Sequence, residues 1–143
     1  MYENRYILIP LLSLFLSQII KFIIESIKQK KLDFKRLFSG SGGMPSSHTA
    51  LTASLLTILV IDEGIRSPLT AIMLVVFLIV AYDGMNVRLE TGKQAKTINT
   101  LVEAIFSPDS FEKLKEQLGH KPKEVFFGII LGVAVAVLYS LFI

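Results

Sequence analysis

The stretch that decides the fold is HKPKEVFFGIILGVAVAVLYSLFI, residues 120–143. From Val125 onward it carries no charged residue, and as a helix it is long enough to cross the hydrocarbon core of a bilayer. Pro122 suits the first turn of such a helix, because proline lacks the N–H that the first turn leaves unpaired. The stretch therefore predicts a membrane-spanning helix with His120 at its entrance.

Three further apolar runs precede this one. The second of them is short for a full span, so either it begins below the membrane surface or its helix is tilted. Ser67 and Pro68 are a typical N-cap and first-turn pair for the third. We expect an all-α fold, a polytopic membrane helix bundle with about four transmembrane helices plus amphipathic surface helices. It forms a single integral membrane domain over residues 1–143, with spans near 6–27, 47–62, 67–85 and 123–143.

The composition agrees with a membrane protein and excludes several kinds of site. Hydrophobic residues make up 52% of the 143, and the mean hydropathy is +0.58. The chain has no cysteine, and its two histidines lack the spacing of a histidine-rich metal site, so we expect no metal and no other cofactor. The net charge of +3 is clustered beside apolar runs, which favours the lipid bilayer over nucleic acid as the partner.

A polar segment, roughly residues 86–123, separates the third and fourth runs. Apolar residues recur at helical spacing from Ala95 to Ile105, Ser107 and Pro108 resemble a helix start, and Gly119 resembles a C-terminal stop. We expect an amphipathic insert over about 93–119. Its two amphipathic helices lie on the membrane surface or pack on the bundle.

The distribution of lysine and arginine predicts the orientation. With four spans, residues 28–46 and 86–123 face one side of the membrane, together with Lys21. This side holds thirteen of the fifteen cationic residues, and the other holds only Arg5 and Arg66. The positive-inside rule places the crowded side, with both histidines, in the cytoplasm. We therefore expect an integral, multi-pass protein of the cell membrane with a cytoplasmic active-site side.

The loop before the second run reads GGMPSSHTA, residues 42–50. Its glycines let the backbone approach an anion closely, and the helix that follows presents N–H groups and a favourable dipole. Gly43, Ser46 and Ser47 are therefore candidate phosphate-binding residues, with His48 in the first helical turn. The alternative is a Gly/Ser turn with a serine cap and an incidental histidine.

The second histidine has a carboxylate four residues after it. Glu124 can accept a proton from one imidazole nitrogen of His120, which leaves the other nitrogen available as a nucleophile or base. The alternative is a polar interface residue followed by a first-turn glutamate that the helix dipole favours.

Cations on the first helix form a third group. Lys21 lies inside or at the rim of the first run, where a charge is costly and usually functional. Gln18, Lys21, Glu25 and Lys28 follow one helical face, which makes both lysines candidate phosphate-binding residues. The alternative is snorkelling of Lys21 and a simple membrane exit at Lys28.

The third run ends in YDGMNVR, residues 82–88. Arg88 suits bidentate contact with phosphate. Asp83 lies five residues earlier and points elsewhere on a continuous helix, so we expect it to support the site by binding another cation, such as Lys21 or Lys28. The alternative is that these charges simply mark the membrane surface.

Together these motifs resemble the signatures of the type 2 phosphatidic acid phosphatase (PAP2) superfamily. GMPSSHTA, residues 43–50, resembles its second signature, Pro-Ser-Gly-His. HKPKEV, residues 120–125, resembles the end of its third, a histidine followed four residues later by aspartate. With YDGMNVR included, nearly the whole chain is similar to a divergent branch of small bacterial membrane proteins, the DUF212 group.

The resemblance implies a role for each matched residue. His120 corresponds to the nucleophile that forms a phosphohistidine, and Glu124 to the acidic group that orients it. His48 corresponds to the general acid, and Ser46 to a phosphate ligand. No metal is required in this superfamily.

The chain departs from the superfamily pattern at several positions. Glu124 stands in place of aspartate, Ser47 in place of glycine, and Leu114 where the third signature has arginine. The first signature survives only as Lys21 and Lys28. Members usually have six spans, so four spans imply a reduced PAP2-like core or a homodimer that completes the bundle.

Two functions from different classes follow. The first is a metal-independent membrane phosphatase that hydrolyses a lipid phosphate of the phosphatidylglycerophosphate, phosphatidate or polyprenyl (pyro)phosphate type. Lys21, Lys28 and Arg88 would stabilise its transition state. The second is a non-catalytic membrane protein that binds an anionic lipid or phosphate in the same basic pocket.

Overall fold

The computed structural model describes residues 4–30, 43–106, 111–116 and 118–142, and their regular structure is helical throughout. The helices are α1 (Arg5–Gln29), α2 (Ser47–Glu63), α3 (Pro68–Met85), α4 (Val87–Ile105) and α5 (Pro122–Phe142). The predicted all-α class is confirmed, and each of the four predicted spans corresponds to one helix. Ser67 caps α3 by accepting a hydrogen bond from the Leu69 N–H at 3.3 Å, as its position before Pro68 predicts.

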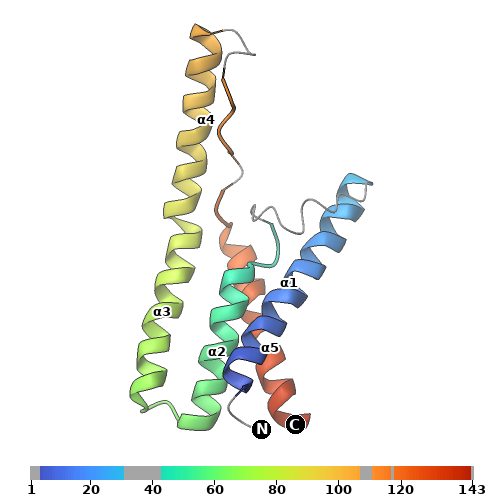
Figure 1. The fold of residues 1–143 in the computed structure, drawn as a ribbon, viewed down its shortest axis with the longest axis vertical. Helices are drawn as coiled ribbons and strands as arrows, with labels where there is room; N and C mark the ends of the chain where they lie inside the picture. The colour runs from blue at the N-terminus through green and yellow to red at the C-terminus, as the bar shows by residue number, and fades with distance from the viewer. Residues whose placement is uncertain (1–3, 31–42, 107–110, 117, 143) are drawn as a thin grey trace.

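Helix α2 lies at the centre of the bundle and packs against α1, α3 and α5 (Figure 1). Both marked ends of the chain lie at one end of the bundle, near the turn between α2 and α3. There, Arg5 at the start of α1 pairs with Asp62 near the end of α2, at 2.9 Å. The opposite end of the bundle holds the starts of α2 and α5 and the junction of α3 with α4, while α1 diverges from the other helices toward its own end.

Small residues allow α2 and α5 to pack almost backbone to backbone. A Cβ atom on Gly128 would lie 2.6 Å from the carbonyl oxygen of Ser46, and one on Gly132 would collide with the carbonyl oxygen of Ala50. Such close approach is typical of membrane helices, whose association depends on van der Waals packing. It fixes the start of α5 relative to the start of α2.

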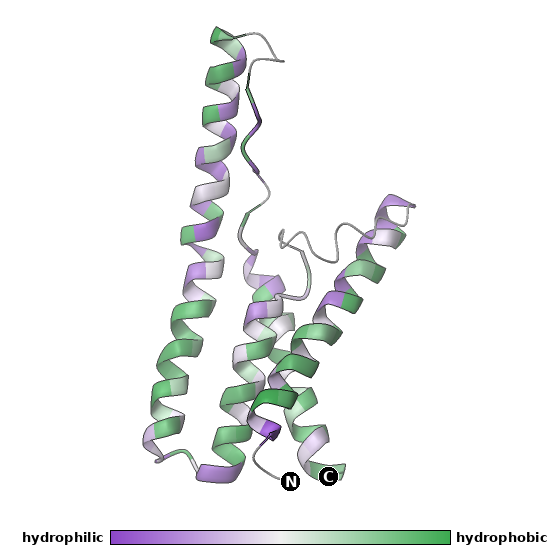
Figure 2. Ribbon diagram, viewed as in Figure 1, coloured by the Kyte–Doolittle hydropathy of each residue, from purple (hydrophilic) through white to green (hydrophobic). Residues whose placement is uncertain are grey.

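The outer surfaces of the helices are apolar enough for a bilayer. Three stretches are long and apolar enough to cross a membrane, namely Arg5–Gln29, Pro68–Ile105 and Pro122–Phe142. Helix α2 has 17 residues and lies among them, as the short second run predicts. Large exposed apolar side chains, such as Ile72 and Ile79, lie along α3, and Figure 2 shows the bundle helices to be largely hydrophobic.

The first of the two predicted amphipathic helices is present as α4. It begins at Val87, directly after the single turn residue Asn86, and continues α3 beyond the ends of the other helices (Figure 1). Polar and apolar residues alternate along it (Figure 2). It is therefore an extension of a membrane-spanning helix rather than a helix packed on the bundle.

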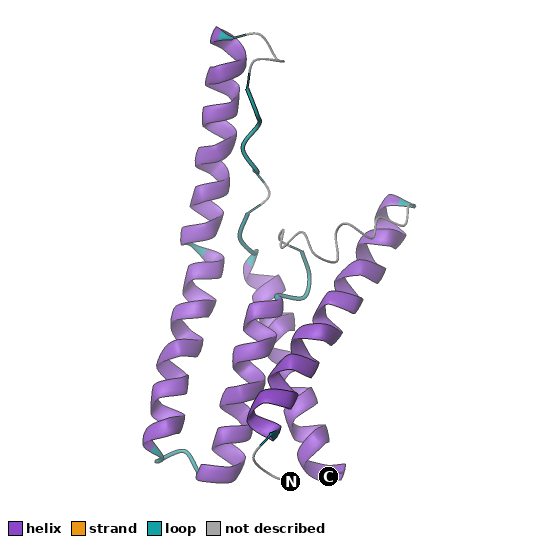
Figure 3. Cartoon of the chain, in the orientation of Figure 1, coloured by secondary structure: helices purple, strands orange, loops and turns teal. Residues whose placement is uncertain are grey.

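The prediction of a second amphipathic helix was wrong over residues 111–116, which form an irregular segment beside α4 (Figure 3). The physical reason is that Asn99 of α4 hydrogen-bonds both the N–H and the C=O of Leu114, the groups that a helix would have paired internally. The predicted start at Ser107 and Pro108 lies outside the described residues. We call residues 111–116 and 118–121 the strap.

Candidate active site

Polar side chains from every element at one end of the bundle converge on a single region. Sequence analysis singled out residues from all of these elements. The structure places Lys21 on α1; Ser46, Ser47 and His48 at the start of α2; Asp83 and Arg88 at the α3–α4 junction; and His120 and Glu124 at the start of α5.

Backbone hydrogen bonds tie the two histidine-containing stretches to each other and to α3. The Ser46 N–H donates to the Glu124 carbonyl oxygen at 2.9 Å, and the His120 N–H donates to the Gly84 carbonyl oxygen at 2.8 Å. Because the Ser46 N–H is already paired, it is not the phosphate-binding amide that a Gly/Ser loop suggests. Gly84, which was not among the predicted site residues, holds His120 against α3 through its carbonyl oxygen, and a Cβ atom on it would meet the imidazole at ordinary van der Waals range.

A cavity of about 160 Å³ lies among these elements. Both histidines line it, together with Ser46, Ile79, Val80, Asp83, Gly84 and Arg88. Lys21 and Lys28 are not among its described lining residues. The structure thus places the two histidines on one cavity with an arginine, although 71 residues separate them in the sequence.

The predicted pair of His120 and Glu124 is present. The Nδ1 atom of His120 lies 3.2 Å from Oε2 of Glu124, and the same oxygen accepts the Lys121 N–H at 3.1 Å. Glu124 is thereby oriented by the backbone of the residue that precedes its own helix. When Nδ1 carries the proton that Glu124 accepts, the lone pair is on Nε2.

Burial lowers the pKa of His120 below its ordinary value, while hydrogen bonds to Glu124 and to the backbone of Gly43 act in the opposite direction. The side chain is 11% exposed, so removal from water is the largest influence. An imidazole whose pKa is lowered stays neutral at more acidic pH than an ordinary imidazole does. A neutral imidazole is the form that can act as a nucleophile.

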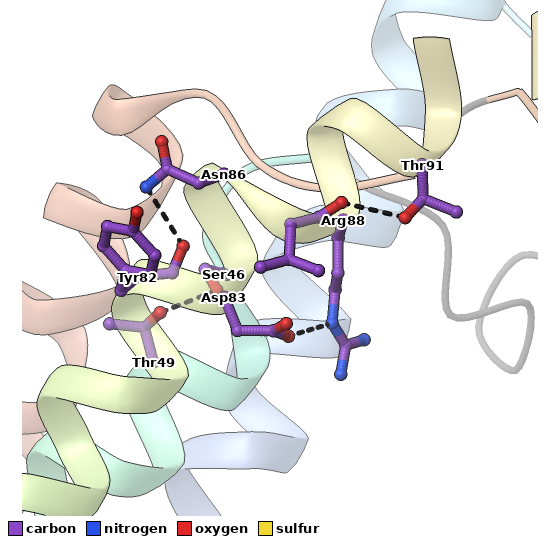
Figure 4. A network of polar contacts seen from close by, with 8 residues as sticks. Ser46, Thr49, Tyr82, Asp83, Asn86, Arg88 and Thr91 are labelled. Carbon is purple, nitrogen blue, oxygen red and sulfur yellow. Dashed lines mark hydrogen bonds and ion pairs between the residues drawn. The ribbon is translucent and has the colours of Figure 1, made fainter. Parts of the chain in front are cut away.

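His48 occupies the first turn of α2, as predicted, and its side chain is exposed. Its neighbour Ser46 is buried, and the Ser46 hydroxyl lies 2.9 Å from the Thr49 hydroxyl (Figure 4). Ser46 is the N-cap residue of α2, but its side chain makes no cap hydrogen bond. Its hydroxyl is instead directed to Thr49, at the wall of the cavity.

Lys21 is buried rather than snorkelling, with 7% of its surface exposed. Its Nζ atom donates to the Ser47 hydroxyl at 3.4 Å, which joins α1 to the start of α2. Gly43 packs beside it: a Cβ atom there would lie 3.5 Å from the Lys21 side chain and 3.1 Å from the Glu25 carboxylate. Lys28 lies further along α1 and is exposed.

The expectation that Asp83 and Arg88 do not pair was wrong. The Nε atom of Arg88 donates to Oδ2 of Asp83 at 2.6 Å (Figure 4). The reason is Asn86, whose φ of −115° and ψ of −69° interrupt the helix between them. The interruption changes the helical phase and brings two side chains five residues apart onto one side. Asp83 therefore holds Arg88 at the cavity, instead of binding Lys21 or Lys28.

The arrangement offers chemistry suited to a phosphate ester. One buried imidazole is oriented by a carboxylate, a second imidazole lines the same cavity, and Arg88 supplies positive charge for an anion. Among the described residues, no group of three or more histidine, aspartate or glutamate side chains is placed to hold a metal ion.

Comparison with known proteins identifies the family. The profile of the divergent PAP2 family matches residues 2–135. The chain is also 37% identical, over 152 aligned positions, to the uncharacterized membrane protein YuiD of Bacillus subtilis (strain 168), with 97% of this chain and 96% of YuiD covered. No solved structure matches the chain. The protein therefore belongs to the divergent PAP2 family of membrane proteins.

Proposed function

We propose that the protein is a metal-independent membrane phosphatase that hydrolyses a lipid phosphate through a phosphohistidine intermediate. The observation that carries the proposal is the His120–Glu124 pair, which shares one cavity with His48 and Arg88. Membership of the divergent PAP2 family supports the same class of chemistry. The substrate types that fit are phosphatidylglycerophosphate, phosphatidate and polyprenyl (pyro)phosphate.

The proposed reaction has two steps. Nε2 of His120 attacks the terminal phosphorus and forms a P–N bond while the P–O bond to the leaving group breaks, and His48 donates its proton to the leaving oxygen. The leaving group is the lipid alcohol of a monoester or the lipid monophosphate of a pyrophosphate. Water then attacks phosphorus and forms a P–O bond while the P–N bond breaks and its electron pair returns to Nε2. His48 takes a proton from the water, and inorganic phosphate leaves. Glu124 holds the Nδ1 proton and stabilises the positive charge on the phosphorylated ring.

Cations around the cavity would stabilise the charge on the phosphoryl oxygens. Arg88 lines the cavity and is positioned for this role by Asp83. Lys21 would act from beside Ser47, with the hydroxyls of Ser46 and Ser47 as donors, and exposed Lys28 would attract the anionic headgroup.

An apolar groove beside the cavity supports a lipid substrate. This groove, about 580 Å³, lies on the outer face of α3 and is lined by Leu78, Ile79, Ala81, Tyr82, Asp83, Met85 and Val87. Ile79 and Asp83 line both the groove and the polar cavity. A lipid could therefore place its chain along α3 and its phosphate beside the histidines.

The proposal places this end of the bundle in the cytoplasm, because it carries most of the lysines and arginines. Helix α4 provides an exposed reporter at Thr100, and the chain has no cysteine of its own. In Thr100→Cys, an impermeant thiol reagent should label only after the cells are opened. Labelling in intact cells would reverse the orientation.

A second function is favoured by one specific contact. Arg88 donates its Nε–H to Asp83, which leaves part of the guanidinium committed to a neighbouring carboxylate. Such a site can hold an anionic lipid or phosphate without turnover, and the protein would then be a binding protein of the same membrane.

Phosphate release distinguishes the two functions. Purified protein in detergent micelles is offered the three lipid phosphate classes with EDTA present, alongside His120→Ala and His48→Ala. Metal-independent release that both substitutions abolish supports the phosphatase. Folded protein that binds these lipids and releases no phosphate supports the binding protein.

A further inference from the structure

The strap that carries His120 has no helix of its own, so contacts with α4 must fix its course. Where it passes Gly92, a Cβ atom on that glycine would lie 2.5 Å from the Glu116 carbonyl oxygen. Further along, a Cβ on Gly119 would collide with the backbone of Leu89. Near the end of the strap that lies far from His120 in sequence, Lys113 pairs with Glu103 of α4. Both side chains are largely exposed, which makes this ion pair a weak constraint.

Asn99 makes the buried polar attachment of the strap. It is 3% exposed, and both ends of its side-chain amide are used. Nδ2 donates to the Leu114 carbonyl oxygen at 2.8 Å and to the Glu116 carboxylate at 2.9 Å, while Oδ1 accepts the Leu114 N–H at 2.9 Å. Removing this side chain would leave the N–H and C=O of Leu114 without these partners at a part-buried position, which carries a cost.

The helix that carries Asn99 also carries Arg88. The two residues are eleven positions apart, roughly 16 Å along an α-helix. The strap runs back over this distance to His120, whose N–H is bound to Gly84 of α3. Asn99 therefore connects the helix that carries the arginine to the segment that carries the nucleophile.

We propose that Asn99 is a positioning residue for the phosphatase, acting through the strap to hold His120 against Glu124 and opposite Arg88. The inference rests on the proposed function for its catalytic consequence. Asn99 touches no substrate, so its loss lowers the rate of the chemical step while lipid binding along α3 is kept. A misplacement of about 1 Å at reacting atoms can cost on the order of a hundredfold in rate.

Steady-state kinetics on micellar lipid phosphate provide the first test. Asn99→Leu, which keeps the approximate size but none of the hydrogen bonds, should lower kcat by roughly ten- to a hundredfold with KM within about threefold of wild type. Thr100→Leu is the matched control, because Thr100 is exposed and its hydroxyl bonds the Lys96 carbonyl oxygen one turn earlier on the same helix. Equal kcat values for the two variants would overturn the proposal.

A rescue pair separates positioning from general damage. Asn99→Asp keeps the acceptor for the Leu114 N–H but sets a carboxylate against Glu116, so its kcat should fall. Adding Glu116→Gln restores a donor across this contact and should recover part of the lost rate. A double variant no faster than Asn99→Asp contradicts the proposed link.

The imidazole itself supplies a readout that does not depend on activity. In a His48→Gln background His120 is the single histidine, and its ¹⁵N NMR signals report the Nδ1 hydrogen bond to Glu124. Asn99→Leu should average or lose this signature, and Thr100→Leu should keep it. An unchanged signature in Asn99→Leu overturns the inference. If wild type releases no phosphate, the proposed function fails, and this spectrum still decides what Asn99 does.

Discussion

The two histidines of the site are held in different ways. His48 is part of the first turn of α2, so the helix that bears it also fixes its position. His120 lies in the strap before α5 and depends on contacts from two separate helices, namely Glu124 of α5 and the Gly84 carbonyl oxygen of α3. The histidine proposed to form the covalent bond is thus the one whose placement relies most on the rest of the fold.

The largest effect should come from removing the imidazoles themselves. His120→Ala removes the nucleophile and should lower kcat by on the order of 10⁴-fold or more. His48→Ala removes the general acid and should cost roughly 10²- to 10⁴-fold on a lipid phosphate. Phosphate release in micelles measures both.

An aryl phosphate with a good leaving group sharpens this contrast. Such a leaving group needs little protonation, so the first step should be largely spared in His48→Ala and still lost in His120→Ala. Equal losses in the two variants would contradict the assigned roles.

The next effect concerns the orientation of His120. Glu124→Gln keeps the shape of the side chain, but its amide can donate to Nδ1 and favour the wrong tautomer. A loss of roughly 10³- to 10⁴-fold in kcat is expected by analogy with catalytic triads. Glu25→Gln, near Lys21 and Gly43, is the control and should lose far less. Near-normal turnover by Glu124→Gln would show that the carboxylate does not orient the nucleophile.

A smaller effect should separate two glycines that both have a positive φ. Gly119 has φ of +79° and Gly64 has φ of +81°. A Cβ on Gly119 would collide with the Leu89 backbone, whereas nothing lies within 4 Å at Gly64. Both alanine variants carry a backbone cost, which at Gly64, with ψ of 162°, is on the order of 1–3 kcal/mol. Only Gly119→Ala should also displace the strap and slow turnover, by roughly tenfold. Turnover by Gly119→Ala as fast as that by Gly64→Ala would argue against a tightly packed strap.

The smallest effect is a lowered pKa of the His120 imidazole. Because burial lowers the pKa of His120, its imidazole in a His48→Gln background should titrate below pH 6.5, the ordinary midpoint for histidine. The unfolded chain then binds the proton more readily, so His120 should reduce stability as pH falls from 6.5 to the lowered pKa. NMR titration of the single histidine measures this pKa. A midpoint at or above 6.5 would mean that hydrogen bonds to Glu124 and Gly43 outweigh burial.

Local patterns were enough to predict the bundle. Long uncharged runs predict helices whatever their neighbours, and Ser67 and Pro68 mark the start of α3 correctly. The pairing of His120 with Glu124 was also predictable, because four residues at a helix start bring two side chains together. The cavity that both histidines line agrees with the sequence motifs, although the catalytic roles stay predictions.

The remaining features depend on contacts that local patterns do not contain. The spacing of Phe111, Leu114 and Leu118 suits a helix, but Asn99, fifteen residues before Leu114, takes the backbone groups of the segment. Asp83 and Arg88 pair because one residue, Asn86, leaves helical geometry. Gly119 matters because the Leu89 backbone approaches it, although its sequence context suggested a helix stop. Gly84 matters through the hydrogen bond of its carbonyl oxygen with the His120 N–H, which no local pattern predicts.

The most direct test of the central claim is to trap the covalent intermediate on His120. Protein mixed with a ³²P-labelled lipid phosphate and quenched within the first turnovers should carry label that is stable in alkali and lost in acid, as phosphohistidine is. Mass spectrometry should place it on the peptide that contains His120, and His120→Ala should carry none. Label on another residue, or label that persists in His120→Ala, would contradict the account.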